Sequence, residues 1–296
     1  ADMKKWDMER FVVPGLVGVL AFVIFPLLDV IIRSFRTGGF GTFAGMTNYE
    51  VVIHNDAFQL AAENNFWFVV VSVVLLMVIS LFVSIVVYSM TGNLIRFAFL
   101  IPMAIPSNAM AVVWKILFSD AGIINGILVE HLHLQSVHFL EGRMVFLLFV
   151  GTFIFKNVGY NMLIWISGLS AIPQEIYDAA KVDGADEFKS IWYITLPNIR
   201  RTAFVAAILS MVNSFKIFRE LYLITGGYPD MHIYQLQHVF NNWFLKLDIS
   251  KLTAGAVLTA LGFLGMIVIF RILLLTEWKD MIHLMTGGKR NVKEKK

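Results

Sequence analysis

Residues 66–88 read FWFVVVSVVLLMVISLFVSIVVY, an apolar run without a charged side chain. A helix of about 20 such residues spans the hydrocarbon layer of a bilayer and satisfies its own backbone hydrogen bonds there. The composition agrees with this interpretation, because 58% of the 296 residues are hydrophobic and only 15% are charged. Soluble domains carry roughly 25% charged residues, so the sequence predicts an integral membrane protein.

Similar apolar runs lie on both sides of this stretch, and together they predict an all-α membrane fold with six transmembrane helices in a single domain, 1–296. The predicted spans are 11–32, 66–88, 95–118, 145–167, 203–224 and 254–275. Pro102 and Pro106 fall within the third span, where we expect them to kink one helix. The first run is too long for a signal peptide and lacks an A-x-A cleavage site, so we expect a retained helix.

The orientation follows from Lys and Arg, which concentrate in the cytoplasmic loops of membrane proteins. With the N-terminus in the cytoplasm, fifteen Lys and Arg residues are assigned to the cytoplasmic side and five to the external side. We therefore expect both termini in the cytoplasm, with external segments at 33–65, 119–144 and 225–253. The loop 168–202 is then the long cytoplasmic connection.

The sequence lacks the residues and motifs that are characteristic of several function classes. The chain has no Cys, which excludes disulfides, thiolate metal sites and cysteine nucleophiles. It has no G-x-x-x-x-G-K-[ST] loop, so we expect ATP to be bound by another chain. H-E-x-x-H and G-x-S-x-G are also absent. The histidines within 119–144 lie in a predicted loop, where such a cluster is more often part of the solvent-exposed surface than a set of metal ligands. We expect neither an enzyme nor a metal site.

The loop 172–201 contains helix start and stop signals that a simple connection between two spans would not need. Pro173 suits the first position of a helix, and Gly184 can adopt the left-handed conformation that ends one. Asp186 can then cap a second short helix. Because a turn of about four residues would join the two spans, this helix–Gly–helix pattern indicates a docking element for a cytoplasmic partner. An amphipathic hairpin lying on the bilayer is the alternative.

This loop resembles the EAA coupling motif of binding-protein-dependent ABC importer permeases. The matching residues are Asp178, Ala179, Ala180, Gly184, Ile194, Leu196 and Pro197. Asp178 departs from the motif, which has Glu at that position, and its carboxylate reaches one methylene less far.

Three further stretches are similar to MalF-type carbohydrate permeases, and the resemblance extends over about 14–275. They are Ile-Ile-Asn-Gly-Ile-Leu (123–128), Ala-Ile-Pro-Gln-Glu-Ile-Tyr (171–177) and Thr-Gly-Gly-Tyr-Pro (225–229). The last has Tyr228 where a further Gly is usual.

The resemblance implies a multi-pass subunit of the bacterial inner membrane that imports a sugar or oligosaccharide. Its partners would be membrane lipid, a second homologous permease subunit, an extracytoplasmic solute-binding protein and two ATPase subunits that bind ATP and Mg²⁺. It implies no cofactor on this chain and no nucleic-acid partner. The residues that would couple to the ATPase are Asp178, Ala179, Ala180, Gly184, Leu196 and Pro197.

Polar residues in two spans are candidates for binding the sugar. Ser210, Asn213 and Ser214 lie at i, i+3 and i+4 spacing in the fifth span, near the bilayer midplane where transporter sites occur. By resemblance, these positions and Asn157 and Tyr160 of the fourth span match places where family members contact sugar. The alternative is that Ser and Asn join helices to one another.

Charged residues inside the predicted spans are expected to have specific partners. Lys156 either faces the substrate cavity or pairs with a carboxylate of the partner subunit. Lys216 and Glu220, four residues apart, are expected to pair, and Arg219 is expected to extend outward.

Three other functions stay open at this point. Permeases for non-sugar solutes share the coupling motif. An integral-membrane enzyme would need convergent carboxylates or histidines in the bundle, and a channel or secondary transporter would need no docking loop. The loop at 173–197 separates these classes best, because an ATPase-coupled machine requires a docking element there.

Overall fold

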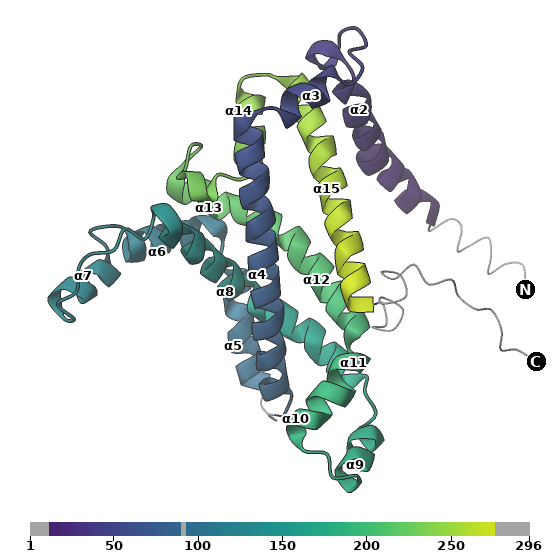
Figure 1. The fold of residues 1–296 in the computed structure, drawn as a ribbon, viewed down its shortest axis with the longest axis vertical. Coiled ribbons are helices and arrows are strands. Elements are labelled where there is room, and N and C mark those ends of the chain that lie inside the picture. The colour runs from purple at the N-terminus through teal and green to yellow at the C-terminus, as the bar shows by residue number, and fades with distance from the viewer. Residues whose placement is uncertain (1–11, 90–92, 276–296) are drawn as a thin grey trace, which may run out of the picture. The chain divides into compact units, whose positions relative to one another are not determined.

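The computed structural model describes residues 12–89 and 93–275, which form helices joined by short connections (Figure 1). No strand occurs among these residues, although Arg36 and Phe43 form an isolated bridge. Six helical segments are long and apolar enough to cross a membrane: Val12–Ser34, Asp56–Tyr88, Ser107–Glu130, Gly142–Ser170, Arg200–Thr225 and Ile249–Leu275. The predicted all-α fold with six spans is therefore confirmed. The termini and Phe11, the first residue of the first predicted span, lie outside the described residues.

The helices between residues 20 and 170 are η1 (Leu20–Ile24), α2 (Phe25–Ser34), η2 (Thr37–Gly39), α3 (Thr47–Ile53), α4 (Asp56–Tyr88), α5 (Asn93–Ala104), α6 (Ser107–Phe118), α7 (Ile123–Glu130) and α8 (Gly142–Ser170). The remainder holds α9 (Gln174–Val182), α10 (Glu187–Ser190), η3 (Ile191–Thr195), α11 (Leu196–Asn198), α12 (Arg200–Ser214), η4 (Phe215–Ile217), α13 (Phe218–Thr225), η5 (Met231–Ile233), α14 (Leu236–Leu245) and α15 (Ile249–Leu275).

The third predicted span is not one kinked helix, and this prediction was wrong. The chain forms α5, leaves the helical conformation at Pro106 (φ −59°, ψ 143°) and restarts as α6. Pro106 has no N–H to donate, and its ring disfavours the helical conformation of Ile105. Pro102, by contrast, lies within α5. The segment long and apolar enough to span in this region is Ser107–Glu130, in which α6 and α7 are separated by a turn at 119–122.

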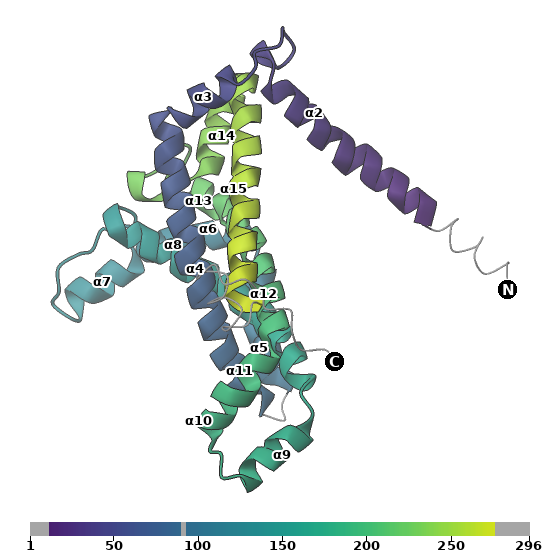
Figure 2. The ribbon, with the colours of Figure 1, turned by 45° about the vertical axis from the view of Figure 1, so that its right-hand side comes forward.

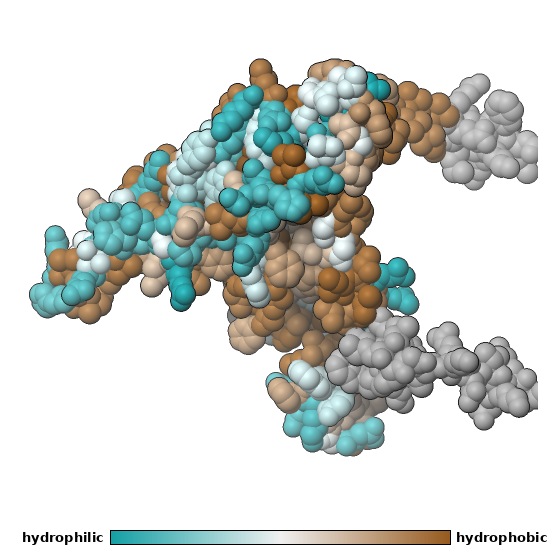
Figure 3. Space-filling view, turned by 45° about the horizontal axis from the view of Figure 1, so that its top comes forward, coloured by the Kyte–Doolittle hydropathy of each residue, from teal (hydrophilic) through white to brown (hydrophobic). Residues whose placement is uncertain are grey.

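Large hydrophobic side chains are exposed along the apolar helices. Phe22, Phe82 and Leu261 are 83%, 68% and 59% exposed. Hydrophobic residues cover much of the face shown in Figure 3. In water such a surface would drive association, whereas lipid chains solvate it.

The described residues form two compact units, one from residues of 1–63 and 235–263 and one from residues of 64–234 and 264–296. In the first unit, the Phe58 and Trp243 rings stack with centroids 6.1 Å apart. A Cβ added to Gly255 would lie 2.8 Å from the Trp243 ring, so this close packing requires glycine.

The second unit is organised around α8, whose Phe149 and Phe153 are fully buried. Two indole N–H groups tie α8 to its neighbours. Trp165 Nε1 donates to Ser80 Oγ of α4 at 3.0 Å, and Trp114 Nε1 of α6 donates to Thr152 Oγ1 at 2.5 Å. These two indole groups are thus paired across helices, as a lipid environment demands.

Candidate functional site

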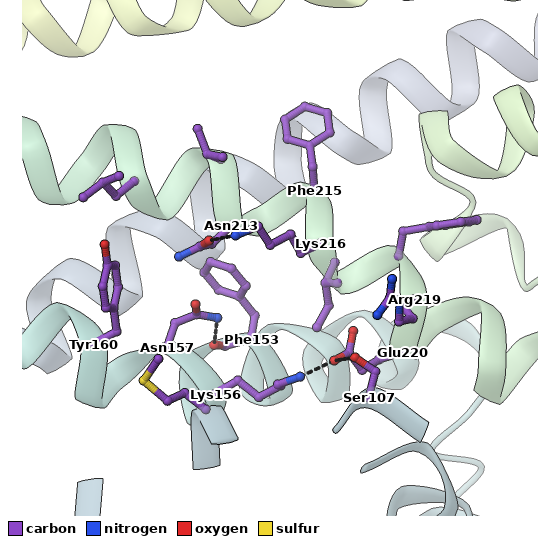
Figure 4. A pocket seen from close by; sticks show the side chains of 15 residues that line it. Ser107, Phe153, Lys156, Asn157, Tyr160, Asn213, Phe215, Lys216, Arg219 and Glu220 are labelled. Atoms are coloured by element: carbon purple, nitrogen blue, oxygen red, sulfur yellow. Dashed lines mark hydrogen bonds and ion pairs between the residues drawn. The ribbon is translucent and has the colours of Figure 1, made fainter. Parts of the chain in front are cut away.

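A cavity of about 810 Å³ opens in the second unit, between α8 on one side and α12, η4 and α13 on the other (Figure 4). Its polar lining consists of Ser107, Lys156, Asn157, Tyr160, Asn213, Lys216, Arg219 and Glu220. Apolar side chains, Phe153 and Leu209 among them, complete the wall. This combination of an apolar surface and a few placed polar groups is typical of small-molecule sites.

Helical periodicity explains how α8 lines the cavity. Phe153, Lys156, Asn157 and Tyr160 follow the i, i+3, i+4, i+7 spacing that places side chains on one helix face. A hydrogen bond within α8 orients the Asn157 side chain. Asn157 Nδ2 donates to the Phe153 backbone oxygen at 2.8 Å, and its Oδ1 points into the cavity (Figure 4). Asn157 therefore offers the cavity a hydrogen-bond acceptor.

The opposite wall is shaped by the 3₁₀ turn η4, which interrupts the fifth span. Lys216 lies in η4, three residues after Asn213 near the end of α12, and its Nζ donates to Asn213 Oδ1 at 2.8 Å. The Asn213 amide nitrogen then points into the cavity (Figure 4). Asn213 offers a donor opposite the acceptor of Asn157, with Tyr160 contributing a hydroxyl and an aromatic face.

Glu220 is paired with Lys156 of α8, so the predicted Lys216–Glu220 pair is wrong. The i,i+4 rule holds only within a continuous α-helix, and Phe215–Ile217 is a 3₁₀ turn. Ser107 Oγ of α6 donates to the same carboxylate at 2.8 Å. The Glu220 residue is only 2% exposed. Lys156 thus lines the cavity and takes its counter-ion from its own chain.

The structure separates Ser210 and Ser214 from Asn213. Ser210 is fully buried and donates to Asn161 Oδ1 of α8 at 3.0 Å. Ser214 is 2% exposed and donates to the Met211 backbone oxygen at 2.6 Å. Neither serine lines the cavity. The Ser210 hydroxyl therefore joins α12 to α8, and the Ser214 hydroxyl bonds to the backbone of α12 itself. Asn213, Asn157 and Tyr160 remain as the predicted substrate residues that line the cavity.

A second cavity of about 490 Å³ shares Tyr160 with the first. Its other lining residues come from α8 and α12, and they include Ser167, Arg201 and Thr202. The sequence reasoning missed this cavity and the hydrogen bond of Ser107 to Glu220. No local pattern marks either one, since both depend on which helices meet.

The predicted coupling loop forms a helical hairpin, α9 followed by α10, that projects beyond α11 and α12 (Figure 2). Gly184 has φ +78°. The Gly184 N–H donates to the Lys181 oxygen at 3.1 Å and the Ala185 N–H to the Ala180 oxygen at 2.9 Å. These two bonds form the Schellman motif, in which the left-handed position favours glycine.

The second helix of the hairpin begins at a side-chain cap. Asp186 Oδ1 accepts from the Lys189 N–H at 2.7 Å. Tyr177 of α9 and Thr195 are joined by their hydroxyls at 2.9 Å, which fixes α9 to the segment that leads back to the membrane. The hairpin therefore has a defined geometry.

The outer surface of the hairpin is accessible. Asp178 and Ala179 are exposed, and Ala180 is half-buried. Val182 and Phe188 are 88% and 73% exposed. Leu196 packs against the Trp165 cluster, whereas Pro197 is exposed. The hairpin thus presents apolar and acidic groups side by side, without a core of its own to cover them.

A protein family and two of the similar permeases place this chain among known proteins. The sequence profile of the family described as "Binding-protein-dependent transport system inner membrane component" matches residues 77–276. The osmoprotective compounds uptake permease protein GgtC of Synechocystis is 31% identical over 73% of this chain and 81% of its own length. The trehalose/maltose transport system permease protein MalF of Thermococcus litoralis is 29% identical over 88% of this chain and 90% of its own length.

A solved structure shares the fold. It is described as a bacterial ABC transporter involved in the import of the acidic polysaccharide alginate. One of its chains superposes with a TM-score of 0.78 over 93% of this chain and 98% of that chain, at 17% sequence identity.

Proposed function

The chain belongs to the family of binding-protein-dependent transport system inner membrane components, and on that premise we propose that it is one membrane-spanning half of an ATP-driven importer of a sugar or oligosaccharide. As a member of this family it is a multi-pass permease subunit of the inner membrane. The solute, the coupling to ATP and the partner chains belong to the proposal. A second homologous permease, two ATPase subunits that bind ATP and Mg²⁺, and a solute-binding protein would complete the assembly.

The observation that carries the sugar assignment is the polar pattern of the large cavity. Asn157 presents an acceptor and Asn213 a donor, and Tyr160 lies at the same wall. A sugar hydroxyl both donates and accepts, so it satisfies either amide, and an aromatic ring packs against a pyranose face. The name of the Thermococcus relative points to the same class of solute.

The coupling assignment rests on the α9–α10 hairpin. Exposed Val182 and Phe188 need a partner surface, and the exposed Asp178 supplies a polar contact beside them. A docked ATPase would bury these groups, and closure of the ATPase pair would move α11 and α12 through the Tyr177–Thr195 contact. The motif residues Ala179, Ala180, Gly184, Leu196 and Pro197 shape and anchor this hairpin.

The test is the ATPase activity of the assembled transporter in proteoliposomes, with and without its binding protein and a panel of oligosaccharides. Gly184→Trp places a bulky side chain on the hairpin at a left-handed position, and we expect it to abolish stimulated activity. Gly45→Trp is the matched control, because Gly45 likewise has a positive φ (+58°) and open space around it but lies in a predicted external loop. Stimulation by sugar that only Gly184→Trp removes supports both assignments.

A non-sugar solute is the second candidate, because the Synechocystis relative is named for osmoprotective compounds. The same panel should include zwitterionic and polyol osmolytes. Stimulation by these and by no sugar would retain the importer and reject the sugar. If the Gly184→Trp variant hydrolyses ATP as the wild type does, the coupling assignment fails.

A further inference from the structure

The large cavity contains more positive than negative charge. Lys156, Lys216 and Arg219 line it, and Glu220 is the single carboxylate in its lining. The Glu220 carboxylate is already paired with Lys156 and accepts from Ser107. Its side chain is only 3% exposed. The one negative charge of the lining is therefore neutralised by Lys156, another residue of the same cavity wall.

Lys216 and Arg219 have no such counter-ion among the described residues. Lys216 Nζ donates to the amide oxygen of Asn213, which is neutral, and Arg219 forms no ion pair with a described carboxylate. The two residues lie three positions apart, at η4 and the first turn of α13. Both are exposed to the space they line. Their charges are therefore available to a bound molecule.

Such an arrangement is costly for a membrane segment unless a ligand or another protein group compensates the charges. Charged side chains within spans are rare and usually mark a substrate path or a specific partner. A neutral solute would displace water from both cations and offer no charge in return. An anionic group would offset that loss, and arginine binds carboxylate and phosphate with two parallel hydrogen bonds.

The second cavity continues this pattern on the other side of Tyr160. Arg201 lines it, and its lining contains no Asp or Glu. A solute that passes Tyr160 from the first cavity into the second would therefore meet cationic groups before and after it, and no unpaired carboxylate in either described lining.

We propose that the imported solute is an acidic carbohydrate, with Lys216 and Arg219 binding its carboxylate or phosphate while Asn157, Tyr160 and Asn213 bind its hydroxyls. This inference rests on the proposed function and names the substrate class of the same cavity. Lys216 is the link between the two kinds of recognition, because it holds the Asn213 oxygen and so turns the amide nitrogen toward the sugar. The shared chemistry is an anionic group on a hydroxyl-rich ring.

The experiment measures binding to the assembled, detergent-solubilised transporter without its binding protein, so that the selectivity of the binding protein does not enter. The probes are trigalacturonate, the uncharged galactotriose and a maltose phosphate. We expect at least one anionic probe to bind tenfold or more tightly than galactotriose, with an affinity that weakens as salt rises. The uronate and phosphate arms show which anion the site takes, and binding of either supports the proposal.

The variants locate the effect. Lys216→Met/Arg219→Met should remove the preference for the anionic probe, while Arg219→Lys, which keeps the charge, should retain most of it. Arg143→Met/Lys246→Met is the matched control, since it removes two exposed cations that do not line either cavity. Thermal unfolding of each variant in the same detergent verifies that it is folded.

Three results would overturn the inference. Equal binding of galactotriose and both anionic probes by the wild type is one. Anion binding that the Lys216/Arg219 variant retains in full is another. The third is loss of the second permease subunit from that variant on purification, which would mean that these cations pair with carboxylates of the partner. In the first case, stimulation of ATP hydrolysis by galactotriose would retain the importer proposal while the acidic substrate falls.

Discussion

Gly159 of α8 lies directly against the backbone of α5 in the second unit. A Cβ added there would clash with the Phe99 backbone oxygen of α5, and side-chain movement cannot relieve a contact with backbone. We expect Gly159→Ala to separate α5 from α8 and to destabilise the protein by about 1–3 kcal/mol, as overpacking does elsewhere. Gly151→Ala in the same helix is the control, because nothing lies within 4 Å of its added Cβ. Thermal unfolding in detergent compares the two, and an equal melting temperature would contradict this packing.

The Lys156–Glu220 pair provides a second prediction at this scale. Removing one partner of a buried ion pair leaves an uncompensated charge and costs about 3–5 kcal/mol. We expect Lys156→Met to destabilise the protein strongly. Lys156→Met/Glu220→Gln should recover much of the loss, since the amide oxygen that replaces the carboxylate would still accept from Ser107. Melting temperatures of the two variants and the wild type measure this coupling. A double variant no more stable than Lys156→Met would mean that the two side chains do not interact.

Individual residues also show how far sequence reasoning reaches. Asn157, Tyr160 and Asn213 were predicted from polarity and resemblance, and all three line the cavity. Ser210 was predicted with them, but three residues along an α-helix leave two side chains about 60° apart around the axis. That angle suffices to turn Ser210 from the cavity into the contact with Asn161. The pairing of Glu220 with Lys156 was beyond prediction, because it joins residues far apart in the sequence.

At the scale of elements, α14 should make the stability of the protein depend on pH. His238 is fully buried, and burial lowers its pKa from 6.5 to about 4. The unfolded chain therefore binds a proton between pH 6.5 and 4 that the folded chain does not, so stability is full above pH 6.5 and falls as the pH decreases through this range. We expect a loss of about 2 kcal/mol between pH 7 and 5, measured as a fall in melting temperature.

The control is His238→Gln, which removes the titrating group. The Gln235 N–H donates to His238 Nδ1 at 3.1 Å, and a glutamine at this third helical position can accept the same bond. The variant should therefore lose less stability than the wild type between pH 7 and 5. Asp230 does not interfere in this range. Burial raises its pKa, but hydrogen bonds from His232 and Gly142 outweigh burial and leave the pKa below 3.8. A variant with the pH dependence of the wild type would exclude His238 as its cause.

Breaks in helices set the limit of prediction for whole elements. The apolar runs located the spans, because length and polarity alone decide whether a helix can cross lipid. They could not locate η4, since Asn213, Ser214 and Phe215 carry no breaker such as proline or glycine. They also underestimated Pro106, because prolines are tolerated within many membrane helices when neighbouring groups satisfy the freed backbone. Both breaks lie beside the cavity, where non-helical backbone is tolerated.

At the scale of the whole molecule, the distribution of Lys and Arg predicts which loops face the cytoplasm and which face the outside. The chain has no cysteine, so a single introduced thiol reports its own accessibility to a membrane-impermeant maleimide. Val182 and Tyr228 are suitable sites, being 88% and 73% exposed. We expect Tyr228→Cys to react in intact cells, and Val182→Cys to react only in inverted vesicles. The opposite pattern would reverse the orientation, and reaction of both from one side would mean that a span between them is wrongly assigned.

The same thiol connects sidedness to assembly. Val182 lies at the end of α9, where the proposed ATPase contact would cover it. We expect the co-expressed ATPase to slow labelling of Val182→Cys in inverted vesicles at least tenfold, and to leave a thiol at Leu245, at the end of α14, unaffected in intact cells. Combined with Gly184→Trp, the protection should disappear, because the hairpin could no longer dock. Full labelling of Val182→Cys in a complex that hydrolyses ATP would place the coupling contact elsewhere on the molecule, while the membrane topology derived from Tyr228→Cys would remain.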